Sequence, residues 1–295
     1  MSDHHHHNID ASVGDRRLGL AIAINMLLTL AQIIGGLMSG SLSLIADALH
    51  NFSDAASLWI AWAARKISRR PADHFKTFGY KRAEIIATLI NLVTLVIIGL
   101  YLIYEALWRI HEPQIIEGWI VIIVAAVALI IDIATAILTF SMSKGSMNIR
   151  AAFLHNVSDA LASVGVIIAG SLILLYQWYW VDTLITLLIA GYVLYQASTL
   201  LPETIHILMQ GTPKNIVIDD VITHIENING VLNIHHVHIW QLDEQRNALE
   251  AHIVIERFDQ INEIKGAIKT DLLQRYAIDH STLEFEEAHC EQRDC

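Results

Sequence analysis

The sequence predicts an α-helical membrane protein with six transmembrane helices, followed by a small C-terminal α+β domain. Hydrophobic residues make up 54% of the 295 residues and charged residues only 17%, and the mean hydropathy is +0.45. A water-soluble globule of this size could not bury so much apolar surface. From about residue 213, the long apolar stretches give way to shorter segments with more polar residues, which indicates a separate soluble domain.

Six apolar stretches are long enough to cross a hydrocarbon core, which needs about 20 helical residues. Ser39-Gly40-Ser41 predicts a tight turn between the first two, and His111-Glu112-Pro113 breaks the chain between the third and fourth. Several Trp and Tyr residues lie near the expected ends, as interfacial aromatic residues do. The expected spans are Leu18–Met38, Leu42–Ala64, Ile85–Trp108, Trp119–Phe140, Ala152–Tyr176 and Trp180–Leu200.

Basic residues indicate which side of the membrane each connection faces. Arg16 and Arg17 precede the first span, seven basic residues fill the connection between the second and third, and Lys144 and Arg150 lie between the fourth and fifth. The opposite side has little beyond Arg109. Both termini are therefore expected in the cytoplasm, together with the C-terminal domain.

The part of the chain after Leu201 is strongly acidic, with 7 basic and 17 acidic residues. Such a segment repels nucleic acid and attracts cations, so nucleic-acid binding is excluded as a function. Its hydrophobic pattern predicts the order αββαβ, with the helices on one face of a small sheet. The expected elements are a helix over Asp219–Ile228, strands over His235–Leu242 and Ala248–Ile255, a helix over Asn262–Tyr276 and a strand over Ser281–Glu286.

These patterns divide the chain into five parts. Residues 1–16 form a cytoplasmic tail, residues 17–201 the membrane domain, residues 202–212 a linker, residues 213–288 the α+β domain and residues 289–295 a second tail. The cluster His4–His7 in the first tail is either an expression-tag remnant or a native metal-collecting segment. The only two cysteines, Cys290 and Cys295, lie in the last few residues, so no disulfide framework holds the fold together.

One short phrase occurs twice inside the expected spans. It reads Leu-His-Asn-Phe-Ser-Asp-Ala over residues 49–55 and Leu-His-Asn-Val-Ser-Asp-Ala over residues 154–160. In each copy the His and the Asp are four residues apart, so they share one helix face. If the two helices face each other, two imidazoles and two carboxylates converge in a set that suits tetrahedral coordination of a divalent ion, Zn²⁺ before others. The four candidate ligands are His50, Asp54, His155 and Asp159.

A structural alternative is a pair of His–Asp hydrogen bonds that tie the helices together. An ionisable side chain in mid-membrane costs about 2.5–3.5 kcal/mol even on a lenient scale, so its presence on two spans favours a bound cation. Asp47 lies on the same helix face as His50 and Asp54. It either supports the ligands or relays protons there, and the alternative is a hydrogen bond to a neighbouring helix. Asp132, in the fourth span, has no evident partner and is either a proton site or faces a water-filled cavity.

In combination, these residues resemble the cation diffusion facilitator family, in particular its zinc-type divalent-metal/proton antiporters and the bacterial zinc/cobalt/cadmium efflux subgroup. The resemblance covers nearly the whole chain. It implies six spans, a cytoplasmic domain similar to metallochaperones, a homodimer, and metal/proton exchange at the four-ligand site. It rests on Ser41–His50 running into Asp54, on Arg70–Asp73 with Thr77–Tyr80 and Arg82, on the His155/Asp159 pair and on His235–Trp240.

The same resemblance implies a metal site in the cytoplasmic domain. Its ligands would be His235, His252, His280 and Glu286, with Glu287 as an alternative to Glu286. Cys290 and Cys295 resemble the terminal cysteine pair of related zinc exporters, and the alternative is a tail of reduced thiols. Some of the histidines could instead be surface or dimer-contact residues.

Two local patterns refine these expectations. Strand alternation places His235 on one face of its strand and His236 and His238 on the other. In the connection between the second and third spans, some family members carry a further metal site, but here only Asp73 and His74 remain of it, so a full site is not expected.

We therefore expect a transporter, and not an enzyme, that exports Zn²⁺, and also Cd²⁺ or Co²⁺, from the cytosol by alternating access in a bacterial inner membrane. Protons would be the counter-ion, because protons and metal compete for the same His and Asp side chains. The expected partners are a second copy of the chain, the bilayer and the divalent ion. The alternatives are a membrane-tethered metal sensor, which moves no ions, and an embedded metalloenzyme, whose typical His-Glu-x-x-His motif occurs in none of the spans.

Overall fold

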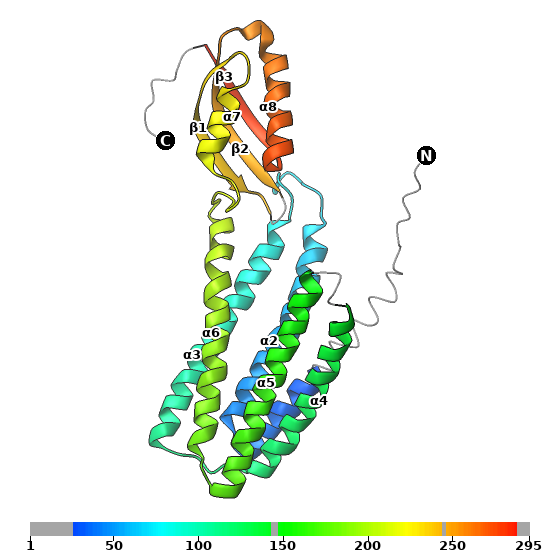
Figure 1. Ribbon diagram of the computed structural model, residues 1–295, viewed down its shortest axis with the longest axis vertical. Helices are drawn as coiled ribbons and strands as arrows, with labels where there is room; N and C mark the ends of the chain where they lie inside the picture. The colour runs from blue at the N-terminus through cyan, green and yellow to red at the C-terminus, as the bar shows by residue number, and fades with distance from the viewer. Residues whose placement is uncertain (1–25, 143–146, 244–245, 288–295) are drawn as a thin grey trace, which may run out of the picture. The chain divides into compact units, whose positions relative to one another are not determined.

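The computed structural model describes residues 26–142, 147–243 and 246–287, and the chain divides into two compact units. The first unit comprises Met1–Ile60 and Asn91–Thr199, and the second comprises Ala61–Ile90 and Leu200–Cys295. Figure 1 labels the long helices and the three-stranded sheet. The long helices are α2 (Leu42–Ser68), α3 (Arg82–His111), α4 (Gly118–Met142), α5 (Met147–Tyr176) and α6 (Trp180–Leu208).

Four described helical segments are long and apolar enough to cross a membrane, namely α3, Gly118–Ile137 of α4, Phe153–Tyr176 of α5, and α6. The described part of the first expected span is a shorter apolar helix, Met26–Ser39. Helix α2 has sufficient length, with 27 residues, but the polar side chains in its middle reduce its apolar character. The structure therefore has a helical transmembrane domain in which four of the six expected spans are identified by length and hydropathy.

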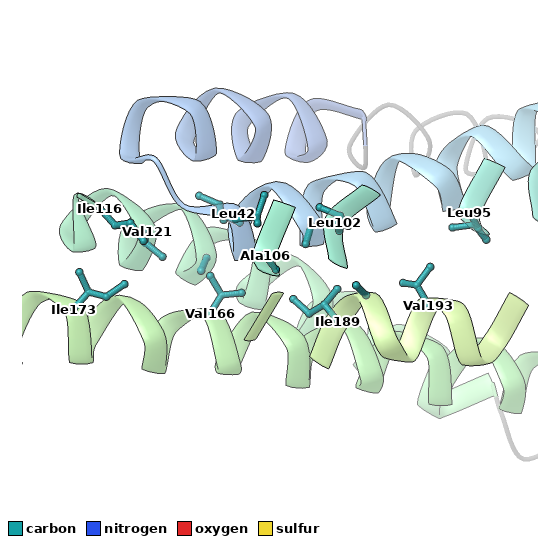
Figure 2. Close-up of a cluster of buried hydrophobic side chains, with 14 residues drawn as sticks. Leu42, Leu95, Leu102, Ala106, Ile116, Val121, Val166, Ile173, Ile189 and Val193 are labelled. Atoms are coloured by element: carbon teal, nitrogen blue, oxygen red, sulfur yellow. The ribbon is translucent and has the colours of Figure 1, made fainter. Parts of the chain in front are cut away.

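The first unit is held together by apolar side chains that the long helices bury against one another. Figure 2 shows Leu42 of α2, Val166 of α5 and Ile189 of α6 among the residues of this cluster. Leu102 of α3 and Val121 of α4 belong to the same cluster and are almost completely buried. Since lipid is as apolar as these side chains, close packing rather than exclusion of water is what stabilises their contacts.

Helices α4 and α5 approach each other closely at two glycines. A Cβ built on Gly118 would lie 2.6 Å from the backbone oxygen of Gly170, and one on Gly170 would lie 3.1 Å from the backbone oxygen of Gly118. No side chain can relieve contacts of this kind, because the neighbouring atoms belong to the backbone. The two glycines thus allow the backbones to meet, as small residues do at membrane helix interfaces.

The second unit contains the sheet, whose elements follow the expected αββαβ order. They are α7 (Ile218–Glu226), β1 (Val231–Gln241), β2 (Asn247–Ile255), α8 (Ile261–Tyr276) and β3 (Ile278–Glu286). Strand β2 is central, antiparallel to β1 and parallel to β3. Both helices bury their apolar residues in one cluster with alternate residues of the strands, such as Ile253, so they cover the same face of the sheet.

A β-bulge in β1 overturns the expected sidedness of its histidines. His235 pairs with His252, and His238 pairs with Glu250, so three steps along β1 match two along β2. His236 takes up the extra residue in a left-handed conformation, with φ of 51°. Because paired residues share a face, His235 and His238 lie on the same face, and the expectation that they lie on opposite faces is wrong.

Candidate metal centre

The two copies of the repeated phrase fall on different helices of the first unit, and their side chains meet. His50 and Asp54 lie on α2, and His155 and Asp159 lie on α5. Each of the four residues offers one ligand atom, and these atoms all lie within 4.8 Å of one another. The convergence that the sequence predicted for the two helices is therefore present.

Within this group, each imidazole is closest to the carboxylate of the opposite helix. His155 Nε2 lies 3.1 Å from Asp54 Oδ2, and His50 Nε2 lies 3.3 Å from Asp159 Oδ1. The distances along each helix, from His50 to Asp54 and from His155 to Asp159, are both 3.6 Å. The four ligands are thus arranged crosswise between the helices rather than as two independent pairs.

Part of the group is buried without hydrogen bonds. His50 is 6% exposed and Asp159 is 7% exposed. Both ring nitrogens of His50 and Oδ1 of Asp159 are buried and lack a hydrogen-bond partner among the residues that the structure describes. Buried polar atoms in this condition cost free energy, about 1–3 kcal/mol each. A divalent cation at the point where these atoms converge would satisfy them, so the donor set fits a metal ion.

A cavity of about 320 Å³ lies beside the group. It is lined by His50, Ser158 and Asp159, and otherwise by largely apolar residues of α5 and α6, such as Ala162 and Leu188. The four-residue group is therefore not sealed on this side, and the cavity leaves room for an ion to approach it.

Asp47 is buried near the group but is not one of its ligands. Its Oδ2 accepts a hydrogen bond from Gln32 Nε2 at 2.5 Å, and Gln32 Oε1 accepts one from Asn51 Nδ2 at 3.0 Å. Gln32 thus bonds to two residues of α2 that lie on either side of His50 in the sequence. This is the bond to a neighbouring helix that the sequence left open as one role for Asp47.

Asp132 has a partner that sequence reasoning did not identify. Ser163 Oγ, on α5, donates a hydrogen bond to Asp132 Oδ2 at 3.0 Å. Ser163 lies one helical turn beyond Asp159, so the carboxylate of Asp132 is held next to the ligand-bearing helix. The sequence could have identified Gln32 and Ser163 as candidate partners, because each is a polar residue inside an apolar helix.

A second group lies on the face of the sheet that the helices leave uncovered. His235, His252 and Glu286 each offer a ligand atom within 4.8 Å of the others. His252 Nδ1 lies 2.7 Å from Glu286 Oε1, and His235 Nε2 lies 3.4 Å from Glu286 Oε2. The other ring nitrogen of His252, Nε2, lies 3.5 Å from Glu284 Oε2.

His280 does not join this second group. It pairs with Ala248, near one end of β2, and its ring makes an edge contact with Phe78 at a centroid distance of 5.5 Å. Glu287 is exposed and also lies outside the group. The remaining candidates, Cys290, Cys295 and His4–His7, fall outside the described residues.

The connection between α2 and α3 uses Asp73 to order its own backbone. The carboxylate accepts hydrogen bonds from the Tyr80 hydroxyl at 2.7 Å and from the backbone N–H groups of Phe75 and Lys76, both at 2.8 Å. These bonds, that of Tyr80 first, lower the pKa of Asp73. Among the described residues, neither Asp73 nor His74 belongs to a metal-ligating group.

The chain matches two family models over almost its whole length. The model described as "Cation efflux transmembrane domain" matches residues 18–209, and the one described as "Cation efflux protein, cytoplasmic domain" matches residues 213–288. Together they cover both the helical part that contains the first group and the sheet that contains the second.

Curated relatives of similar length agree with these matches. The "Cadmium, cobalt and zinc/H(+)-K(+) antiporter" of Bacillus subtilis (strain 168) is 39% identical over 263 residues, which are 88% of this chain and 85% of the relative. The "Metal cation efflux system protein CzcD" of Cupriavidus metallidurans is 36% identical and covers 95% of this chain and 89% of the relative. The "Zinc transporter ZitB" of Pectobacterium atrosepticum is 35% identical and covers 99% and 91%.

Among solved structures, the metal-bound C-terminal domain of the CzcD transporter from Cupriavidus metallidurans is 28% identical to this chain. It covers 24% of this chain and 99% of that structure, with a TM-score of 0.23.

Proposed function

This chain belongs to the cation efflux family of membrane transporters, also called cation diffusion facilitators, and on that premise we propose that it exports Zn²⁺ from the cytosol in exchange for protons. The cargo ion would bind the four-residue group of His50, Asp54, His155 and Asp159, which alternating access would expose to each side of the membrane in turn. The observation that carries the proposal is the meeting of these four ligand atoms from two helices within 4.8 Å.

The chemistry of the four ligands suits an ion that must be bound and then released. Two neutral imidazoles and two carboxylates match the charge of a dication and favour a borderline metal such as Zn²⁺. The set contains no thiolate, so it holds the ion less tightly than a structural cysteine site would. Cd²⁺ and Co²⁺ fit the same ligands, and the name of the Bacillus subtilis relative includes both metals.

Proton coupling follows from the same side chains. Imidazole must be neutral and carboxylate ionised to bind a metal, so protons and metal compete for the group. The reference pKa of imidazole, about 6.5, lies between a near-neutral cytosol and a more acidic outer compartment. Metal would load from the cytosol, and protonation from the outer side would release it and carry protons inward.

Two other buried carboxylates have supporting roles in this proposal. Asp47, bonded to Gln32, holds α2 in place and could relay protons to and from His50, which lies one turn further along the helix. Asp132, bonded to Ser163, adds a negative charge beside the helix that carries Asp159 and attracts the cation.

We also propose that His235, His252 and Glu286 hold Zn²⁺ in the cytoplasmic domain. The acidic charge of this part of the chain would gather cations from the cytosol, and metal bound at this group would stabilise a transport-competent dimer. His280 would not be a ligand in the described conformation, because its ring contacts Phe78. The tail residues Cys290 and Cys295 remain candidates for completing the coordination.

The arrangement in the membrane is part of the proposal. Six spans would place both termini in the cytoplasm of a bacterial inner membrane, as the distribution of Lys and Arg indicates. The functional unit would be a homodimer, with the bilayer and the divalent ion as its other partners.

The test is zinc flux in proteoliposomes that contain a metal-sensitive dye and hold an imposed pH gradient. The unaltered protein should move Zn²⁺ at a rate that depends on the gradient, and Asp54→Asn and Asp159→Asn should each reduce the flux to that of empty vesicles. Asp219→Asn is the matched control, since it removes an exposed carboxylate of α7 and should leave the flux unchanged. Unchanged flux in the Asp54 and Asp159 variants would refute the assignment of the site. No flux in the unaltered protein would favour a membrane-tethered sensor.

A further inference from the structure

A fully buried carboxylate outside the metal centre joins the starts of two helices. Asp182 lies in the first turn of α6 and is 0% exposed. Its neighbours are the first residues of α2, which are about 140 positions away in the sequence. In the transport and metal binding proposed for this chain, Asp182 has no assigned part.

Five hydrogen bonds satisfy this carboxylate, from Ser41, which precedes α2, and from Leu42 and Ser43, the first two residues of α2. Leu42 N–H donates to Oδ2 at 2.8 Å, and the Ser41 and Ser43 hydroxyls donate to Oδ1 at 2.5 and 2.6 Å. The backbone N–H of Ser43 lies 3.3 Å from both oxygens. Together these contacts form an N-terminal cap of α2 that is supplied by a different helix.

Electrostatics explain why a carboxylate is used here. The first N–H groups of a helix have no partner within the helix, and the helix dipole places partial positive charge at this end. Asp182 faces the N-terminal end of α2 and also sits in the first turn of α6, so two positive helix ends share one negative charge. An amide or a hydroxyl could not supply this charge.

The contact fixes the position of α2 along its axis relative to α5. Helix α5 ends at Tyr176 and α6 begins at Trp180, so Asp182 is tied to the end of the helix that carries His155 and Asp159. His50 follows Leu42 at about 12 Å along the axis of α2, at the usual rise of 1.5 Å per residue. A slip of α2 by one residue would rotate its ligands by about 100° and move them away from those of α5.

We propose that Asp182 is the positioning residue of the metal centre. By holding the start of α2 at one height and one rotation, it sets His50 and Asp54 opposite His155 and Asp159. This inference rests on the proposed function, since it assumes that the four-residue group binds metal.

The test replaces Asp182 by Asn, which keeps the size of the side chain but removes its charge and turns one acceptor oxygen into a donor NH₂ group. The full-length protein would carry His252→Ala in addition, so that the cytoplasmic group does not contribute. Cobalt(II) serves as the probe, because the intensity of its visible absorption distinguishes tetrahedral from higher coordination. Asp182→Asn should weaken metal affinity by roughly 10–100-fold, as the loss of groups that orient ligands does, and should reduce the tetrahedral absorption of the folded protein.

Thr183→Val is the matched control, because Thr183 is a buried neighbour in the same turn of α6 and its change should leave affinity and spectrum unaltered. If Asp182→Asn does not fold, the Ser41→Ala/Ser43→Ala variant keeps the carboxylate and should show a smaller loss of affinity. Folded Asp182→Asn protein with the unaltered spectrum and affinity would overturn the proposal, as would an unchanged affinity in the serine variant. A cobalt spectrum that responds to Asp182→Asn in a protein without zinc flux would refute transport and leave the positioning role intact.

Discussion

Replacing Gly118 by Ala tests the close approach of α4 and α5. The added methyl group would lie 2.6 Å from the backbone oxygen of Gly170 and 3.0 Å from the backbone nitrogen of Leu174. Carbon atoms in good contact are about 3.5–4.0 Å apart, so the two helices would have to separate. Since the neighbouring atoms are backbone, no change of rotamer can relieve the clash.

The magnitude follows from a comparison with Gly191→Ala in α6, where the added methyl group meets no atom within 4 Å. Overpacking costs about 1–3 kcal/mol. An Ala in place of a helical Gly without a clash gains about 0.5–1 kcal/mol. The two variants should therefore differ in stability by about 1.5–4 kcal/mol, with Gly118→Ala the less stable.

Thermal unfolding of the two purified variants in the same detergent, at one scan rate, measures this difference. At about 2 °C per kcal/mol, the value for large domains, the midpoint of Gly118→Ala should lie at least about 3 °C below that of Gly191→Ala. Equal midpoints, or a higher midpoint for Gly118→Ala, would refute the described packing of α4 on α5. Because α5 carries His155 and Asp159, we also expect weaker metal binding in Gly118→Ala than in Gly191→Ala.

Two further predictions concern the second unit. His252→Ala should lower the zinc affinity of the cytoplasmic group by roughly tenfold or more, since His252 contacts two carboxylates. His280→Ala is the control and should leave this affinity unchanged. Calorimetry measures both affinities, and equal losses would contradict the three-residue group. Tyr80→Phe should raise the pKa of Asp73 toward its ordinary value of about 3.9, because the Tyr80 hydroxyl is the main cause of its lowering. In the unaltered protein, ionised Asp73 should order its loop fully at a pH above about 3.9. This effect should be lost as the pH falls through the lowered pKa of Asp73. Carbon-13 NMR titration of the Asp73 carboxyl group measures its pKa in the unaltered protein and in Tyr80→Phe. An unchanged titration midpoint in Tyr80→Phe would show that the Tyr80 hydroxyl does not lower the pKa of Asp73.

The convergence of the four side chains of α2 and α5 could be predicted because it depends on a simple periodicity. A His and an Asp four residues apart must share a helix face, and a repeated pair gives a reason for two helices to face each other. The order of elements in the cytoplasmic domain was equally accessible, since alternation marks strands such as β2 and helical spacing marks α8.

Other features depend on pairings that local patterns do not contain. The partners of Asp132 and Asp182 lie on other helices, so no spacing along the chain identifies Ser163 or Ser41 as the donor. The contact of His280 with Phe78 likewise depends on how a loop folds back in three dimensions. In the sheet, alternation failed at His236, because a strand pattern assumes that every residue keeps step with its neighbour on the next strand.

The additional residue at His236 has a consequence for comparing β1 with the same strand in other proteins. A relative without this insertion would show a one-position offset at the strand, and a column-by-column alignment would then match residues that point in opposite directions. Loss of the bulge without loss of a residue would consequently invert the β1 side chains on one side of it, whereas deletion of His236 would leave His235 opposite His252 and His238 opposite Glu250. Sequence length at this point is therefore as much a determinant of ligand geometry as the choice of amino acid.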